Sequence, residues 1–219
     1  MRAIAILAVL LAASPVWAES WYAQRVNQGG GGIGIEHLWS RGASLRSEVV
    51  VGAHPIVTGV DGDRYWIVDR MTGKGVSIQR HPNAIRADDP AKRPFGNEAE
   101  RLQKQGGEYV RDEPIGADAT CRLYKLTDER GRQEVCVGGD ENALPVYVVN
   151  WDRKSKREGR VSYVNWIRGL EIDPAFFRPG AGIEITSYTY DEYVKAAASG
   201  VVGPAPVLYP HLLHGDRAQ

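Results

Sequence analysis

Apolar and polar residues alternate along most of this chain in short runs, which is the pattern of half-buried β-strands. In the run LRSEVVV, for example, Leu45 and Val49 alternate with Arg46 and Glu48. The pattern predicts strands at Ile33–Ser40, Leu45–Val51, Ile56–Val60, Arg64–Asp69, Val76–Gln79, Glu108–Glu113, Thr120–Thr127, Gln133–Val137, Val146–Asp152, Val161–Glu171 and Ile183–Tyr190. Tight turns join the first five, whereas parallel strands need long crossovers, so we expect an antiparallel meander.

Helical signals are few. Residues Phe95–Gln105 form the best internal candidate, with Asn97 as N-cap and a Gly-Gly pair after the last residue. Ser20–Asn27 is amphipathic and fits either a helix or a strand. The glycine run in Gln28–Gly32 lacks the GxGxxG spacing of a phosphate-binding loop, so it is interpreted as irregular backbone.

The N-terminal residues have the layout of an export signal. A positive start is followed by the apolar run Ala3–Ala13 and by small residues at Val16 and Ala18. We therefore expect cleavage after Ala18 and a periplasmic protein. The domain boundaries predicted are 1–18 for the signal peptide, 19–190 for one sheet domain, and 191–219 for a C-terminal extension that contains three prolines and ends without a periodic pattern.

The charge balance excludes some partners. Removal of residues 1–18 takes away one of the 27 basic residues, Arg2, and none of the 27 acidic ones, so the remaining chain is close to neutral. Nucleic-acid binding needs a basic surface, so no nucleic-acid partner is expected. After Ala18 no apolar run reaches the length of a transmembrane helix, and no transmembrane span is predicted.

The two cysteines, Cys121 and Cys136, lie on either side of a turn centred on Asp128–Gly131. Folding back at this turn places both thiols on adjacent strands, and cysteines of exported proteins are usually oxidised, so a disulfide is predicted. A redox-active pair is the alternative. It is disfavoured because the spacing is not CxxC and no helix N-terminus precedes either residue.

Catalytic and metal-binding motifs are weak in this sequence. The pair Asp88-Asp89 and the histidines His211 and His214 are two candidate cation sites, but neither has the number of converging ligands that a metal requires. Several side chains could in principle support acid–base chemistry, namely Asp61, Asp63, Asp69, His37, His54 and His81. None is paired with a nucleophile at a familiar spacing, so no catalytic residue, no metal and no cofactor is predicted.

Four segments carry a resemblance to a known family: DGDRYWIVDR (61–70), EYVRDEPIGADATCRLYKL (108–126), ALPVYVV (143–149) and IDPAFFRPGAG (172–182). Their order and spacing are similar to the periplasmic lipoprotein-carrier superfamily, which includes outer-membrane lipoprotein carriers, mycobacterial lipid carriers and envelope-stress sensor domains. The resemblance implies a mainly β fold with a helical insertion, in which about eleven antiparallel strands form an incomplete barrel covered by helices.

The same resemblance implies an apolar cavity on the concave face. The large side chains that the strands offer as ligand contacts are Trp39, Val49, Val51, Ile56, Trp66, Ile67, Ile78, Tyr124, Tyr147, Val149, Trp151, Tyr163 and Trp166. The first hypothesis is a non-enzymatic carrier of a lipid, an acyl chain or a lipoprotein. The alternative is an interaction or sensing module that binds an envelope protein. A continuous, dry apolar cavity with a mobile lid would favour the first, and a filled core with an exposed apolar patch would favour the second.

Overall fold

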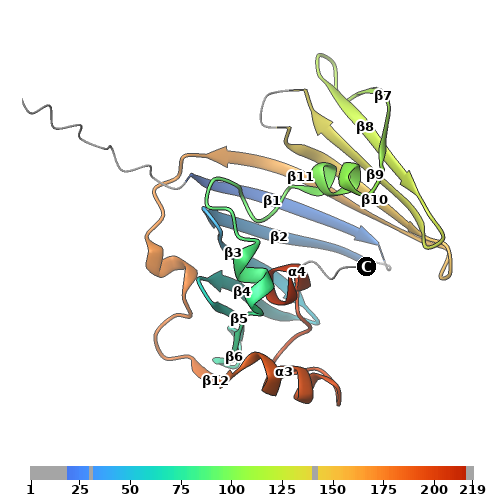
Figure 1. Ribbon diagram of the computed structural model, residues 1–219. Helices are drawn as coiled ribbons and strands as arrows, with labels where there is room; N and C mark the ends of the chain where they lie inside the picture. The colour runs from blue at the N-terminus through green and yellow to red at the C-terminus, as the bar shows by residue number, and fades with distance from the viewer. Residues whose placement is uncertain (1–18, 30–31, 140–142, 216–219) are drawn as a thin grey trace, which may run out of the picture.

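The computed structural model describes residues 19–29, 32–139 and 143–215, so the predicted signal peptide lies outside the described residues. One twelve-stranded sheet dominates the described part of the chain (Figure 1). Its strands are β1 Ser20–Gly29, β2 Gly32–Arg41, β3 Ser44–Val51, β4 His54–Asp61, β5 Arg64–Asp69, β6 Lys74–Gln79, β7 Glu108–Pro114, β8 Thr120–Thr127, β9 Gly131–Gly138, β10 Pro145–Asp152, β11 Arg157–Arg168 and β12 Glu184–Tyr188. The helices are α1 Pro82–Arg86, α2 Glu98–Lys104, the 3₁₀ turn η1 Pro174–Phe177, α3 Tyr190–Ala197 and α4 Pro210–His214.

The strand order is β12-β6-β5-β4-β3-β2-β1-β11-β10-β9-β8-β7, and the sheet is open at both edges. The predicted mainly β half-barrel is therefore confirmed. All eleven predicted strands are present, and residues 20–29, which fitted a helix or a strand, form β1. Since β1 pairs with both β2 and β11, it joins two antiparallel meanders into one sheet.

One pairing differs from the predicted antiparallel arrangement. The last strand, β12, runs parallel to β6, with Glu184 opposite Lys74 and Tyr188 opposite Ile78. The chain reaches this edge by a long connection that passes through η1. A connection of this length is what a parallel neighbour requires, and tight turns could not supply it.

The two faces of the sheet have different surroundings. We call inner the face that carries Leu38, Ile67 and Val148, because these residues belong to the main core together with Leu102 of α2 and Leu213 of α4. Figure 1 shows α2 lying over β9 and β10, and α4 over the half that holds β3 to β5. Both helices therefore cover the same inner face, one on each half of the sheet.

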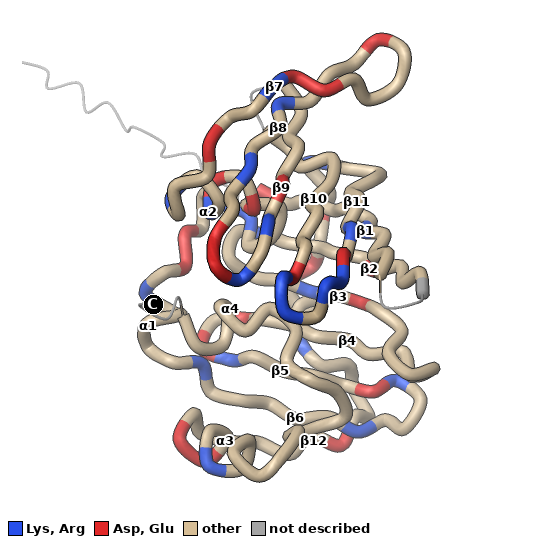
Figure 2. Tube along the Cα trace, turned by 90° about the vertical axis from the view of Figure 1, so that its right-hand side faces the viewer, with Lys and Arg blue, Asp and Glu red and all other residues tan. Residues whose placement is uncertain are grey.

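Smaller clusters stabilise the opposite, outer face. Trp66 packs with Val57 and Val68, and its indole nitrogen donates to the carbonyl of Phe177, at the end of η1, over 2.9 Å. Further along the sheet, a second cluster surrounds the disulfide between Cys121 and Cys136, which are 5.5 Å apart at their Cα atoms. Basic residues gather in the turn between β10 and β11, where Arg153, Lys154 and Lys156 lie (Figure 2).

The disulfide confirms the pairing predicted from the sequence and is typical of exported proteins. No helix among the described residues is long and apolar enough to cross a membrane. Because the disulfide lies on the outer face, we assign it to the stability of the β8–β9 hairpin rather than to the inner face.

Replacing both Cys121 and Cys136 with alanine is expected to lower the free energy of unfolding by about 3 kcal/mol, the entropy gained by the unfolded chain when a loop of this size is opened. Urea unfolding followed by circular dichroism measures the change, and the wild-type protein under reducing conditions is the matched control. Binding of any ligand at the inner face should stay the same. A variant that folds but prefers a different ligand would contradict this assignment.

Candidate functional site

The inner face forms an apolar cup whose floor is provided by the central strands. Leu38, Leu45, Ile56, Ile67 and Ile78 are each almost fully buried there. Such a surface is stable only when it is covered, because each exposed methylene group costs about 0.8 kcal/mol. What covers the cup therefore determines what the site can bind.

The helix α2 covers the half of the cup formed by β8 to β10. Leu102 of this helix is completely buried against the sheet. Phe95, just before the helix, stacks on Trp166 with 5.6 Å between ring centroids. Trp166 in turn stacks on Tyr163 at 5.3 Å. This aromatic stack fixes the first cover to β11.

The second cover is the C-terminal segment, defined here as residues 199–215. Leu213 is fully buried and Leu212 is 8% exposed, and both belong to the main core. Ala205 is also buried, and at Gly203 an added Cβ would lie 2.7 Å from Val76 of β6. The segment thus fills the half of the cup that faces β2 to β6, which is part of the concave face on which a cavity was predicted.

Three main-chain carbonyls of the C-terminal segment accept hydrogen bonds from residues of β5 and of the segment directly after β6. The Tyr65 hydroxyl donates to Leu208 O, and Arg80 Nε donates to Leu212 O over 2.6 Å. The amide of His81 donates to Leu213 O over 2.9 Å. These bonds fix the path of the segment without depending on its side chains.

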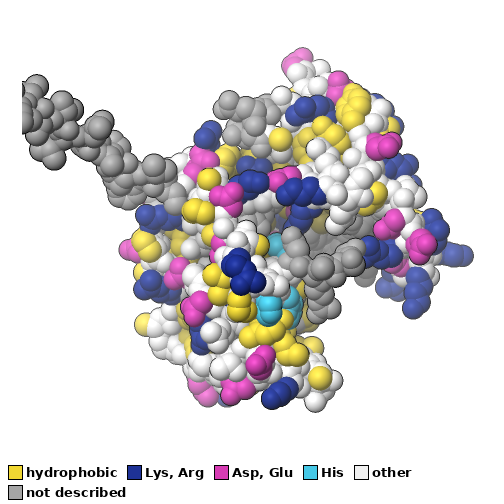
Figure 3. Space-filling view, in the orientation of Figure 1, with side chains coloured by type: hydrophobic (Ala, Val, Ile, Leu, Met, Phe, Trp, Pro, Cys, Tyr) yellow, Lys and Arg dark blue, Asp and Glu magenta, His cyan; other side chains and the backbone are white. Residues whose placement is uncertain are grey.

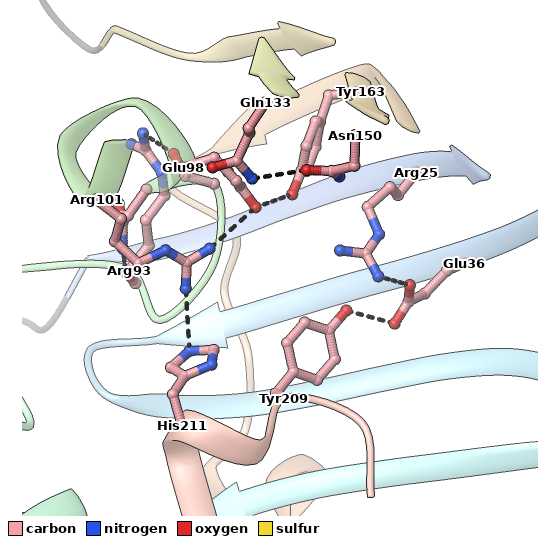
Figure 4. A network of polar contacts seen from close by, with 12 residues as sticks. Arg25, Glu36, Arg93, Glu98, Arg101, Gln133, Asn150, Tyr163, Tyr209 and His211 are labelled. Carbon is pink, nitrogen blue, oxygen red and sulfur yellow. Dashed lines mark hydrogen bonds and ion pairs between the residues drawn. The ribbon is translucent and has the colours of Figure 1, made fainter. Parts of the chain in front are cut away.

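A polar seam separates the two covers (Figure 4). On the floor, Glu36 is 2% exposed, pairs with Arg25 and accepts from Ser47 and from the Tyr209 hydroxyl of the C-terminal segment. The Arg25 guanidinium also lies 5.4 Å from the centroid of the Tyr209 ring. A buried carboxylate is thus paired with a cation and with two hydroxyl donors, as its burial requires.

The seam continues from this pair towards α2. The Tyr163 hydroxyl donates to Glu98 over 2.7 Å, and Arg101 lies 3.6 Å from the same carboxylate. Arg101 Nη1 also lies 3.5 Å from Nε2 of His211 in α4. The polar contacts therefore connect both covers to each other and to β1 and β2.

The pKa values in the seam keep its hydroxyl groups neutral and its guanidinium charged. Burial raises the pKa of the Tyr209 and Tyr163 hydroxyls, and the neighbouring carboxylates Glu36 and Glu98 raise it further. Burial opposes the charge of Arg25, but Tyr209 and Glu36 outweigh it and keep its pKa above the ordinary value. The tyrosines consequently remain neutral donors, and Arg25 remains a cation.

The predicted ligand contacts are divided between the two faces of the sheet. Those whose side chains belong to or pack against the inner core are Val49, Ile56, Ile67, Ile78, Tyr124, Tyr163 and Trp166. Trp66, Tyr147 and Val149 belong to the outer clusters. Trp39 is also on the outer face, where its ring lies 5.4 Å from that of Phe176. Val51 and Trp151 are at strand ends, where Val51 is 37% exposed and Trp151 is half-buried.

The pockets beside the covers are open and lined by charged side chains. One, of about 260 Å³, lies between α1, α2 and α4 and is bordered by Asp89, Lys92 and His211. Another, of about 440 Å³, lies between α2 and the β8–β9 turn and is bordered by Arg101, Asp128 and Arg132. Both are open and have charged side chains in their walls, unlike the dry apolar cavity that an acyl chain would need.

Two residues considered for catalysis, His54 and Asp69, and one considered for metal binding, Asp88, have structural partners. Asp69 accepts from His54 Nδ1 over 2.8 Å, from the amide of Met71 and from Thr72, which together fix the turn after β5. Burial raises the pKa of the Asp69 carboxyl, but these bonds outweigh it and lower the pKa overall. Asp88 is bound by Arg80 through two 2.7 Å contacts. Among the described residues, no group of three metal-ligating side chains is present.

The most important contributors that the sequence did not reveal are Arg25, Glu36, Arg80 and Tyr209. Each looks like an ordinary strand or tail residue in sequence. One local signal was present: in IGIEHLWS, Glu36 shares a strand face with Leu38, and a charge on a buried face is costly unless it is paired.

No family model and no curated protein matches the sequence. Solved structures do match in fold. An uncharacterised conserved protein from Thermus thermophilus aligns with a TM-score of 0.55 at 10% identity, over 78% of this chain and 91% of that protein. The MucA/MucB complex of Pseudomonas aeruginosa aligns with a TM-score of 0.46 at 13% identity, over 78% of this chain and 59% of that one. An outer-membrane lipoprotein-sorting protein domain from Vibrio parahaemolyticus aligns with a TM-score of 0.33 at 11% identity, over 74% of this chain and 90% of that one.

At identities of 10 to 13%, these similarities concern the fold and not the ligand. This chain spans about three fifths of the MucB structure. The open twelve-stranded sheet with helices on one face has the architecture that the sequence motifs predicted. In its fold, the chain is similar to the uncharacterised Thermus thermophilus protein.

Proposed function

We propose that this protein is a non-enzymatic binding protein of the cell envelope, and that its inner face binds an uncharged segment of a protein partner. One observation carries the proposal. The half of the cup formed by β2 to β6 already holds a peptide, the chain's own C-terminal segment, and buries Leu212 and Leu213 against the floor. A filled core is one of the two features, beside an exposed apolar patch, that were expected of a protein-binding module.

A second candidate guest is a lipid or the acyl chain of a lipoprotein. The observation that favours it is the floor itself, since Ile56, Ile67 and Ile78 are apolar and buried only because the C-terminal segment lies over them. Withdrawal of the segment would expose a surface on which each methylene of an acyl chain gains about 0.8 kcal/mol. The two candidates therefore share one site and differ in the guest.

A full-length variant with Leu212→Ser and Leu213→Ser tests whether the inner face is a binding surface. Loss of both apolar anchors should release the C-terminal segment, so the variant is expected to bind an apolar fluorescent dye more strongly than the wild type does. Val201→Ser is the matched control, because Val201 is 66% exposed and contributes little to the core. Circular dichroism establishes that each variant keeps its sheet.

The same variants are then titrated with a fluorescent fatty acid and examined by native mass spectrometry. Saturable uptake of the fatty acid by the double variant alone would support the lipid candidate. A folded double variant that takes up neither the dye nor the fatty acid, together with a cut protein that binds no peptide in the experiment below, would overturn the proposed function.

A further inference from the structure

The C-terminal segment is held as a bound peptide is held, not as a structural element with its own stability. Its helix α4 has only five residues, one turn, which is too short to be stable in water by itself. Its position comes instead from the three carbonyl bonds to Tyr65, Arg80 and the amide of His81. Main-chain bonds of this kind accept any peptide that follows the same path.

Side-chain specificity comes from two features of the segment. Leu212 and Leu213 enter the core, and the Tyr209 ring lies beside Arg25 while its hydroxyl donates to Glu36. Tyr209 has a φ of 58°, in the left-handed region that is unfavourable for a bulky residue. The surrounding contacts must therefore hold this conformation, in which the tyrosine ring points to one side of the groove and α4 begins directly after it.

The segment also has the composition of an exchangeable ligand. None of residues 199–215 is Lys, Arg, Asp or Glu. The part between α3 and the buried contacts is exposed at Ser199, Gly200 and Val201. Figure 3 shows histidine side chains gathered beside hydrophobic ones on this side of the molecule. The residues that connect α3 to the C-terminal contacts thus run over the surface, and the contacts with the groove begin only after Val201.

We propose that the groove formed by β2 to β6 and α1 is a peptide-recognition site for an uncharged partner segment with the pattern tyrosine–proline–any residue–leucine–leucine. This inference rests on the proposed function and specifies its partner. The chain's own residues 209–213 occupy the site and compete with the partner. Because a tethered ligand acts at millimolar effective concentration, partner binding requires that the C-terminal segment first leave.

The test uses the full-length chain with a protease recognition sequence inserted between Gly200 and Val201. The protein is folded and then cut, so that the C-terminal segment becomes exchangeable. A fluorescently labelled synthetic peptide of residues 201–215 is added, and fluorescence anisotropy measures its binding. We expect saturable binding to the cut protein and at least about tenfold weaker apparent binding to the uncut protein.

Peptide variants test the recognition pattern. Leu213→Asp should weaken binding by about 100-fold, because a fully buried apolar side chain is lost and a charge is introduced. The same change at the exposed Val201, Val201→Asp, is the control and should alter binding by less than about threefold. A peptide that keeps only the four specified residues of the pattern, with glycine and serine elsewhere, should retain binding within about tenfold.

The inference is overturned if the cut protein stays folded and binds no labelled peptide, or if Leu213→Asp binds as well as the wild-type peptide. Uptake of fatty acid without peptide binding by the opened groove would overturn the peptide specificity and leave the inner face as a binding surface for the second candidate, a lipid. The two failures are therefore distinguishable.

Discussion

Replacing Arg80 with methionine is expected to lower the free energy of unfolding by about 3 to 5 kcal/mol, because removal of one member of a buried ion pair leaves its partners without compensation. Arg80 is 1% exposed although it carries a full charge. Its guanidinium binds Asp88 in a bidentate manner and donates to the carbonyls of Gly62 and Leu212. One side chain therefore connects the β4–β5 turn, the segment after α1 and the C-terminal segment.

Urea unfolding followed by tryptophan fluorescence measures the Arg80→Met effect. Arg64→Met is the matched control, since Arg64 lies on the neighbouring strand, is only half-buried and donates to a single hydroxyl, that of Ser77. The control should cost less than about 1 kcal/mol. Arg80→Lys should fall between the two, because lysine keeps the charge but loses the planar fork. A loss below about 1 kcal/mol for Arg80→Met would show that the carbonyls and Asp88 find other partners.

The strands were predictable because their signals are local. In β3, for instance, Leu45 and Ser47 are buried on one face while Arg46 and Glu48 pair on the other, as the alternation indicated. Turn residues such as Gly62, at φ 57°, set the hairpin positions. A pattern of period two and a glycine turn need no knowledge of distant residues, so each can be recognised within a few positions.

The parallel pairing of β12 and the burial of the C-terminal segment were not predictable in the same way. Both depend on surfaces formed by strands more than one hundred residues earlier, such as Val76 of β6 and Tyr65 of β5. Within its own sequence the segment has no hydrophobic period, because only Ala205, Leu212 and Leu213 are deeply buried and they are unevenly spaced. The local pattern therefore indicated an extended tail.

The ligand-contact prediction shows a related limit. The alternation of side chains along a strand predicts that Trp66 and Ile67 point in opposite directions, but it does not predict which of them points into the cup. The structure places Ile67 in the inner core and Trp66 under η1 on the outer face. The choice depends on which face the helices cover, and that information is absent from any single strand.

The second large effect is expected at the polar seam. Replacing Glu36 with leucine should cost about 3 to 5 kcal/mol, since it leaves the Arg25 cation buried without its carboxylate and removes the acceptor of Ser47 and Tyr209. Glu48→Leu is the matched control, because Glu48 lies on the outer face, is 28% exposed and pairs with Arg46. This control should cost less than about 1 kcal/mol.

The double variant Arg25→Met with Glu36→Leu decides what the seam is for. If the ion pair only offsets its own desolvation, two apolar side chains of similar volume should restore most of the lost stability, and a double-mutant cycle in urea would show a strong favourable coupling. The C-terminal segment would still have lost the Glu36 acceptor of Tyr209, so the labelled peptide should bind the cut double variant more weakly than the cut wild type. A double variant as unstable as Glu36→Leu alone would contradict this and assign the ion pair to folding. Recovered stability with weakened peptide binding would assign the buried charges to recognition of the guest, which accounts for their presence in an otherwise apolar cup.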